Sequence, residues 1–466
     1  MTAILNFLLY FTGWPLALVL FCGGVYFTIR TRFPQLRLFG ESIHVVMEKP
    51  SQEGSISSFG ALMISTASRV GTGNIVGVST AICLGGPGAV FWMWVTAILG
   101  GASAFVESTL AQVYKKRDPD GGSYGGPAYY IEDALHSRPL AIVFAVALIF
   151  TYGVGYNMLA SYNLQSAFAG FSFYDKSTTP AILGAIISLL FLYCMLGGGQ
   201  RIVKITGVLV PVMGCLYVLM ALVALILNLG NLGAMFGMIF SNAFDFKAIF
   251  GGFMGSCLMY GFKRGLYSNE AGIGSAPNAA AAADVSHPAK QGLVQMLSVF
   301  IDTLLLCTCT AFMCLCSGME PDAALAGAPY VQAALSATFG SIGPVFIAVA
   351  MLLFAFTTLL GNLFYMDNLF IYLHKGTPSK GFMTGFRIVA SLVVFVGAGM
   401  SMGLLWDTSD VMMGLMTLIN VPVILILGGT AIKALDDYTA QRAAGKNPVF
   451  KASTVGLEGK TDYWND

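Results

Sequence analysis

The stretch VGTGN, residues 70–74, interrupts an apolar segment with two glycines, a threonine and an asparagine. A second stretch, YGFKRGLYSNEAGIG at residues 260–274, interrupts a later apolar segment in the same manner. In lipid, backbone groups freed by such a break need protein, water or a ligand as partners. Paired breaks in two halves of a chain predict an inverted repeat with a binding cavity between them. Close helix packing is the alternative, and it suits isolated glycines such as Gly214 better.

The composition predicts that most of the chain lies in a lipid bilayer. Of 466 residues, 56% are apolar and only 10% are charged, and the mean hydropathy is +0.75. Soluble domains carry about a quarter charged residues. The formal net charge of +1 includes no block of like charge, so nucleic acid is not expected as a partner. The N-terminal apolar stretch lacks a basic region before it, which favours a retained helix over a cleaved signal peptide.

Apolar runs long enough to cross a hydrocarbon core of about 30 Å recur along the chain. They predict an all-α membrane protein of about eleven spans, with two inverted five-helix repeats and one extra N-terminal helix. The spans are residues 6–28, 60–82, 89–113, 139–168, 180–198, 205–229, 247–274, 292–316, 342–365, 384–404 and 410–432. The regions are the extra helix and its connection (1–40), the first repeat (55–235), the second repeat (245–432) and a cytoplasmic tail (433–466).

Lysine and arginine set the predicted orientation. They fall mainly in connections on one side, with Lys263 and Arg264 among them, and the positive-inside rule makes that side cytoplasmic. The opposite connections are acidic and include Asp407 and Asp410. The N-terminus is therefore expected outside and the C-terminus inside, in a bacterial-type inner membrane.

Five ordered blocks resemble the alanine or glycine:cation symporter family, over nearly the whole chain. The most specific is GGPGAVFWMWVTAILG, residues 85–100, which is similar to that family's signature. The resemblance implies a leucine-transporter-like fold, alternating access and sodium-driven uptake of a small neutral amino acid. Sodium is then a co-transported ion, and no organic cofactor is implied. The other blocks are SRVGTGNIVGV (68–78), RDPDGGSYGGPAYYIE (117–132), KRGLYSNEAGIGSAP (263–277) and HPAKQGLVQMLSVFIDTL (287–304).

The chemistry of two broken helices suits a zwitterion together with an alkali ion. Each N-terminal helix end carries about half a positive charge, which attracts a carboxylate, and free carbonyls attract a hard cation. By resemblance, the backbone amides of Thr72 and Gly73 and the side chain of Asn74 hold the substrate carboxylate. The alternative is that Thr72 and Asn74 break the helix without binding a ligand, but polar groups in hydrocarbon need partners.

The resemblance also implies a sodium site with oxygen ligands only, as a hard ion prefers. Its ligands are the carbonyls of Ala67 and Val70 and the adjacent hydroxyls of Thr357 and Thr358. Without the resemblance, the two threonines are expected to bond their own helix backbone, as threonines in membrane helices commonly do.

Ionisable residues within spans need partners, because a charge at the bilayer centre costs about 3 kcal/mol or more. Glu107 resembles the carboxylate that accepts hydrogen bonds from the backbone freed at the breaks. Arg69 and Asp302 either pair across the bundle or act as a gate, and a satisfied core ion pair is the more common arrangement. Glu270 is expected near the cytoplasmic end, as a gate partner or a helix cap.

Two departures from the family pattern concern the substrate. Ala160 stands where the family often has glutamine, and Asn362 stands where many members have tryptophan. If both residues line the pocket, their smaller side chains leave room for a substrate that is bulkier or more polar than alanine. Nearby aromatic residues such as Tyr156 are the alternative, because they can fill the same space.

Other classes of function have less support in the residues. The cysteine cluster at residues 307–316 lacks the geometry of a metal site, since residues two apart on a helix face different sides. The sequence shows neither a nucleotide-binding loop nor a nucleophile motif of the kind that would indicate a membrane enzyme. A channel needs a continuous pore, whereas paired breaks favour alternating access. A proton- or sodium-coupled carrier of another small solute is the second candidate, and no obligate protein partner is evident.

Overall fold

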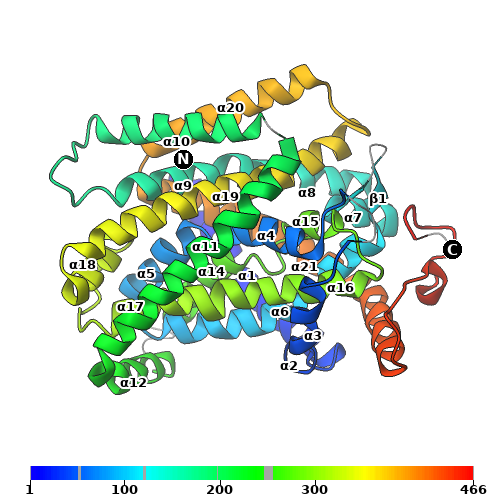
Figure 1. The fold of residues 1–466 in the computed structure, drawn as a ribbon, viewed down its shortest axis with the longest axis horizontal. Helices are drawn as coiled ribbons and strands as arrows, with labels where there is room; N and C mark the ends of the chain where they lie inside the picture. Colours follow the sequence, from blue (N-terminus) through cyan, green and yellow to red (C-terminus); the bar gives the residue numbers. More distant parts are fainter. Residues whose placement is uncertain (1, 51–53, 119–121, 197, 246–255, 465–466) are drawn as a thin grey trace.

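The computed structural model describes residues 2–50, 54–118, 122–196, 198–245 and 256–464 (Figure 1). Helices dominate, and the strands of this part of the chain are the short antiparallel pair β1 (Lys116–Arg117) and β2 (Ser123–Tyr124). The first ten helices are α1 (Thr2–Arg30), α2 (Pro34–Arg37), α3 (Phe39–Val46), α4 (Ser58–Arg69), η1 (Gly73–Gly77), α5 (Val78–Thr80), η2 (Ala81–Gly85), α6 (Ala89–Val113), α7 (Pro127–Leu135) and α8 (Arg138–Phe150).

The remaining helices continue the same pattern of long apolar segments with short interruptions. They are η3 (Thr151–Gly155), α9 (Tyr156–Ser166), α10 (Thr179–Met195), α11 (Gly198–Leu227), η4 (Leu229–Asn231), α12 (Leu232–Ala243), α14 (Cys257–Asn269), α15 (Pro277–Ala281), α16 (Pro288–Val299), η5 (Phe300–Cys307), α17 (Thr308–Leu315), η6 (Ala323–Leu325), α18 (Ala328–Phe339), α19 (Ile342–His374), α20 (Lys380–Ala398), α21 (Met402–Ala443) and η7 (Ala452–Val455).

The chain is a multi-pass membrane protein by the length and composition of its helices. Within the described ranges, eight helices are long and apolar enough to cross a membrane. The apolar helices Gly73–Gly85 and Thr179–Met195 are shorter. The predicted spans 60–82 and 247–274 are each divided into shorter pieces, as the paired breaks require, and residues 247–255 of the latter lie outside the described part.

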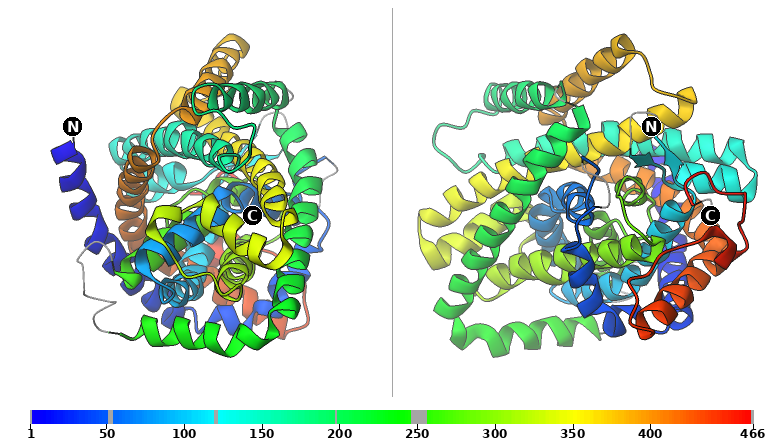
Figure 2. Two further views of the ribbon diagram at one scale, coloured as in Figure 1. Left: turned by 90° about the vertical axis from the view of Figure 1, so that its left-hand side faces the viewer. Right: turned by 45° about the vertical axis from the view of Figure 1, so that its right-hand side comes forward.

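The broken helices lie in the middle of the bundle, and longer helices surround them. Helices α4 and α14 are central in Figure 1, whereas α10 and α20 lie side by side at one edge in all views (Figure 2). A hydrogen bond connects these two outer helices, because the hydroxyls of Ser188 on α10 and Ser391 on α20 are 2.7 Å apart. At the centre, α19 lies against α4 so closely that a Cβ on Gly361 would be 2.5 Å from the Ser68 nitrogen.

Two helices and one pair of charges differ from the sequence-based expectation. The prediction had no helix at α12 or α18, because both lie between the predicted spans. The assignment of Lys263 and Arg264 to the side opposite Asp410 is wrong. Both lie within α14, and the Arg264 Nη2 is 2.5 Å from the Asp410 Oδ2. A count of basic residues treats each one as part of a loop, whereas these two are buried in a helix.

The C-terminal region folds back on the bundle. Helix α21 continues to Ala443, beyond the predicted end of the last span at residue 432. The indole of Trp464 then donates to the Gln112 carbonyl at 2.7 Å, and the Lys115 ammonium lies 3.8 Å from the centre of the Tyr463 ring. The last described residues therefore pack against the end of α6.

Candidate functional site

The break after α4 frees the two carbonyls that the family resemblance assigns to sodium. In a continuous helix the Gly71 amide would donate to the Ala67 carbonyl, and the Asn74 amide to the Val70 carbonyl. Instead the Gly71 amide donates to the Asn74 Oδ1 at 2.9 Å, and the Asn74 amide donates to the Gly71 carbonyl at 3.2 Å. Neither the Ala67 nor the Val70 carbonyl keeps its helical partner, so both are open to a ligand.

Thr358 faces this break from α19. A Cβ on Gly71 would collide with the Thr358 Oγ1, so the hydroxyl sits directly against the backbone of the break. The Thr358 side chain is buried, and its hydroxyl has no hydrogen-bond partner among the described residues. A buried hydroxyl without a partner is unfavourable unless water or a ligand satisfies it. Thr358 therefore fits the predicted sodium site.

The Thr357 hydroxyl bonds the backbone of its own helix, and its part in the sodium site stays a prediction. Its hydroxyl donates to the Leu353 carbonyl at 3.0 Å and lies 3.2 Å from the Phe354 carbonyl, both on its own helix. It also lies 3.6 Å from the Met213 sulfur on α11. Successive residues on a helix are rotated by about 100°, so Thr357 and Thr358 point in different directions.

The η1 segment presents its amino end at the break. The helix begins at Gly73, so the amides of Thr72 and Gly73 lie where helical N–H groups lack intrahelical acceptors. The Thr72 hydroxyl accepts from the Asn163 Nδ2 at 2.9 Å. A Cβ on Gly73 would lie 2.6 Å from the Tyr267 ring, so only glycine fits against this ring. This geometry is compatible with the predicted carboxylate site.

Asn74 has a different part in the site from the predicted one. Its Oδ1 accepts from the Gly71 amide, and its Nδ2 donates to the Asp302 Oδ1 at 2.7 Å. Both ends of the amide are therefore engaged within the protein. The side chain stabilises the broken backbone and joins it to η5, rather than facing a substrate.

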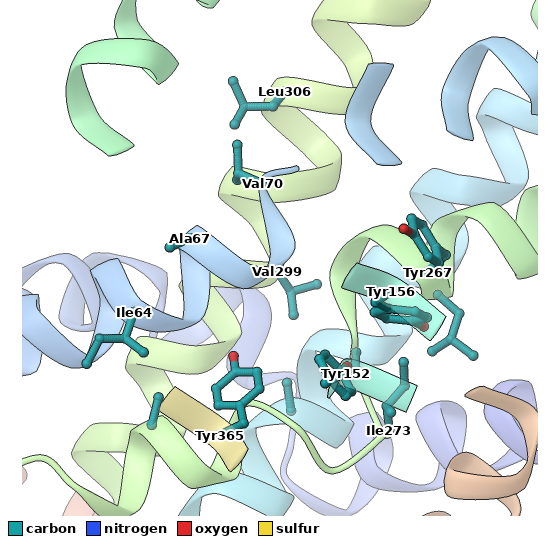
Figure 3. Packing of buried hydrophobic residues seen from close by; sticks show 14 of the residues in the cluster. Ile64, Ala67, Val70, Tyr152, Tyr156, Tyr267, Ile273, Val299, Leu306 and Tyr365 are labelled. Carbon is teal, nitrogen blue, oxygen red and sulfur yellow. The ribbon is translucent and has the colours of Figure 1, made fainter. Parts of the chain in front are cut away.

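A cluster of tyrosines lies beside the break (Figure 3). Tyr152, Tyr156 and Tyr267 form a continuous row, with ring centres 4.8 Å and 4.7 Å apart, and the Tyr365 ring is 5.5 Å from Tyr152. The hydroxyls of Tyr152, Tyr156 and Tyr365 are buried and have no partner among the described residues. Several buried hydroxyls without partners indicate a site that takes water or a polar ligand.

The second break is held by buried carboxylates. Helix α14 ends at Glu270, which has φ 55°, and the following Gly272 has φ 85°. The Gly272 amide donates to the Glu107 Oε1 at 3.2 Å, and the Asn420 Nδ2 donates to the Glu107 Oε2 at 2.8 Å. This is the contact that the supporting role of Glu107 requires.

Glu270 joins the two breaks. Its Oε1 accepts from the Ser68 hydroxyl at 2.9 Å, on α4, and its Oε2 accepts from the Ser275 hydroxyl at 2.7 Å. The residue is buried and ends α14, so it is a cap. It lies against the last turn of α4 beside the first break, and not at an exposed end of the bundle.

Arg69 and Asp302 do not form the predicted ion pair. The Arg69 Nη1 donates to the Gln295 carbonyl and to its Oε1, at 3.3 Å and 3.2 Å. The Asp302 carboxylate accepts from Asn74 and, at 2.7 Å, from the Thr303 hydroxyl. Arg69 has no carboxylate within 4.0 Å in the described part of the chain, and its Nε and Nη2 have no partner there.

Asn362 is buried and belongs to a polar network. Its Nδ2 donates to the Asn157 Oδ1 at 2.9 Å, and its Oδ1 lies 2.7 Å from the Ser68 hydroxyl, whose single proton is shared with the Glu270 carboxylate. Ala160 is buried on α9, one turn after Tyr156. Whether aromatic residues such as Tyr156 fill the space beside Ala160 and Asn362 stays a prediction.

Several members of the site were not predicted. Ser68, Asn157 and Tyr152 connect or surround the breaks, yet each resembles an ordinary helix residue in sequence. The polar run YNMLASYN, residues 156–163, was the available signal, because buried asparagines within an apolar span need partners.

The architecture defines a class of protein. A solved structure of a mutant of the Eremococcus coleocola manganese transporter superimposes with a TM-score of 0.53 at 14% identity. The match covers 86% of this chain and 84% of the other. The chain therefore shares the overall fold of that structure.

Sequence comparison identifies the family. The model of the sodium:alanine symporter family matches residues 1–452, and the chain belongs to that family. It is 43% identical to the amino-acid carrier protein AlsT of Bacillus subtilis, over 95% of this chain and 93% of that protein. It is 42% identical to the probable sodium/glutamine symporter GlnT of the same organism, over 96% and 93%. It is 38% identical to the sodium/alanine symporter AgcS of Methanococcus maripaludis, over 91% and 94%.

Proposed function

We propose that the protein is a sodium-coupled symporter of a small neutral amino acid, with alanine or glycine as the first candidates. It acts as a carrier by alternating access and not as an enzyme. The observation that carries the proposal is the buried Thr358 hydroxyl, which has no partner among the described residues and lies against Gly71 in the first break. Membership of the sodium:alanine symporter family supports the same function.

Sodium binds, in this proposal, among the carbonyls of Ala67 and Val70 and the hydroxyl of Thr358. All three are oxygen ligands, which hard cations prefer. They come from two helices, α4 and α19, so a bound ion stabilises the contact between them. A conformation with that contact intact is thereby favoured when sodium is present.

The amino acid binds beside the same break. Its carboxylate accepts from the amides of Thr72 and Gly73 at the amino end of η1, where the helix dipole favours negative charge. Its side chain faces the tyrosine row. The row fills much of the space near Gly73, since the Tyr267 ring would contact any added Cβ there. This filling favours a small substrate.

The two breaks support the expected architecture of two inverted five-helix repeats, at residues 55–235 and 245–432, with about eleven spans in all. Each repeat then contributes one broken helix to the site. The positive-inside rule supports an outside N-terminus and a cytoplasmic C-terminus in a bacterial-type inner membrane.

A bulkier neutral amino acid is the second candidate substrate. Two observations favour it: a relative at 42% identity is named a probable sodium/glutamine symporter, and several tyrosine hydroxyls near the break are open to a polar side chain. Glutamine carries an amide that such hydroxyls can bind.

Uptake into liposomes tests the function. The purified protein is reconstituted, and labelled L-alanine is supplied with an inward sodium gradient. The expected result is accumulation above equilibrium, which disappears when choline replaces sodium, with L-glutamine competing less well than L-alanine. Uptake that needs no sodium would refute the coupling. Strong inhibition by glutamine but not by alanine would favour the second candidate.

A further inference from the structure

A cavity separate from the breaks lies between α14 and α21. It has a volume of about 490 Å³ and is lined by α14, by the first turns of α21, by η6 and by residues of α5 and η2. Four charged side chains lie on its wall: Lys263 and Arg264 of α14, and Asp407 and Asp410 of α21. We call this cavity the vestibule. Two cations and two carboxylates give its wall no formal net charge.

The charges of the vestibule are incompletely satisfied. Asp410 accepts from Arg264 through one oxygen, with the Lys263 ammonium 3.7 Å from the same oxygen. The other Asp410 oxygen, and the Nε and Nη1 of Arg264, are buried without partners among the described residues. The Arg264 side chain is only 4% exposed and that of Asp410 6%. Buried charges with open hydrogen-bonding positions are expensive, and they mark functional sites in membrane proteins.

The vestibule lies directly over the candidate site. The Arg264 guanidinium is 4.0 Å from the Trp406 ring centre, and that ring is 4.8 Å from the ring of Tyr267. Tyr267 in turn covers Gly73. A Cβ on Gly77 of η1 would contact both Trp406 and Arg264, at 3.8 Å and 3.9 Å. Thus Trp406, Arg264 and Tyr267 form the layer between the vestibule and the first break.

We propose that the vestibule is a second binding site for the zwitterionic amino acid, occupied before the substrate reaches the breaks. The carboxylate binds the open donors of Arg264, and the ammonium group binds the open oxygen of Asp410, with Asp407 beside it. The zwitterion thereby satisfies the positions of Arg264 and Asp410 that the contact between them leaves open. A ligand with only one of the two charges leaves the other half of the pair unsatisfied.

This inference rests on the proposed function, since it assumes that the ligand is an amino acid. The alternative interpretation is that Arg264 and Asp410 form only a structural ion pair that holds α14 to α21. In that case the vestibule is not expected to bind a zwitterion. The two sites also differ in composition. The vestibule relies on charged side chains, whereas the break relies on backbone groups, so substitutions can separate them.

Saturation-transfer NMR with L-alanine tests the proposal on the full-length purified protein. The Gly73→Val variant, in which the added side chain meets Tyr267, removes binding at the break. The expected result is a saturable alanine signal that persists in Gly73→Val and weakens about tenfold or more when Arg264→Gln is added, the scale of one charged hydrogen bond. Propionate and ethylammonium, each with one of the two charges, should compete at least about tenfold less well than alanine.

Two further variants keep the test decisive. Arg387→Gln is the matched control, because Arg387 pairs with Asp367 away from the vestibule, and it should leave the signal unchanged. Asp407→Asn, on a half-buried residue of the vestibule wall, should weaken the signal even if Arg264→Gln fails to fold. No saturable signal in Gly73→Val, or a signal unaltered by the vestibule substitutions, would overturn the proposal. Wild-type protein that binds no amino acid at all would instead refute the proposed function.

Discussion

Replacing Thr358 with valine separates ion binding from folding. Valine matches threonine closely in shape but has no hydroxyl, so one predicted sodium ligand is lost with little change in packing. The Thr358 hydroxyl has no partner among the described residues. Thr358→Val therefore breaks no described hydrogen bond in the ion-free protein.

The magnitude follows from the environment of the hydroxyl. A hydrogen bond or ligand contact to a charged group contributes about 1.5–3 kcal/mol. Each 1.4 kcal/mol corresponds to about a factor of ten, so sodium affinity should fall about ten- to a hundredfold. A buried hydroxyl without a partner costs about 1–3 kcal/mol, so the variant should be at least as stable as wild type in sodium-free buffer.

Thr357→Val is the matched control. The Thr357 hydroxyl bonds carbonyls of its own helix, so the same change one residue away should leave sodium affinity within about twofold of wild type. Sodium titrations of the melting temperature, with lithium and choline for comparison, measure both variants. Because coupling between ligands is mutual, Thr358→Val should also weaken the enhancement of alanine binding by sodium. Equal loss in both variants, or normal sodium dependence in Thr358→Val, would refute this site.

Three further substitutions test other parts of the site. Gly73→Val should abolish high-affinity alanine binding while the protein stays monodisperse, because the new side chain meets Tyr267; wild-type affinity would exclude this backbone from the site. Glu107→Gln should lower the melting temperature and transport together, since it weakens the acceptor of the Gly272 amide by about 1–3 kcal/mol; unchanged stability would show that this bond does not hold the break. Asn362→Trp should destabilise the protein and not shift its selectivity, because Asn362 is enclosed by Asn157 and Ser68; a stable variant that prefers smaller substrates in competition uptake would contradict this.

The breaks were predictable because their cause is local. Glycines and polar residues within an apolar run cannot continue a membrane helix without partners, and VGTGN at residues 70–74 shows this directly. The freed carbonyls of Ala67 and Val70 follow from the same local event. The long spans were predictable for a similar reason, since length and hydropathy are properties of a single segment.

The partners of the site residues were not predictable, because they depend on how helices rotate and pack. Which of two adjacent threonines faces the break is decided by the rotation of α19 against α4. The partner of Asn74 is decided by the neighbouring η5. Arg264 and Asp410 are 146 positions apart in the chain, and only the meeting of α14 with α21 brings them together.

The most direct measurement of the central claim is an experimental structure of the protein with sodium and L-alanine bound. The account predicts a cation between the carbonyls of Ala67 and Val70 and the Thr358 hydroxyl, and an alanine carboxylate at the amides of Thr72 and Gly73. An empty first break, with the ion or the amino acid bound elsewhere in the bundle, would contradict it.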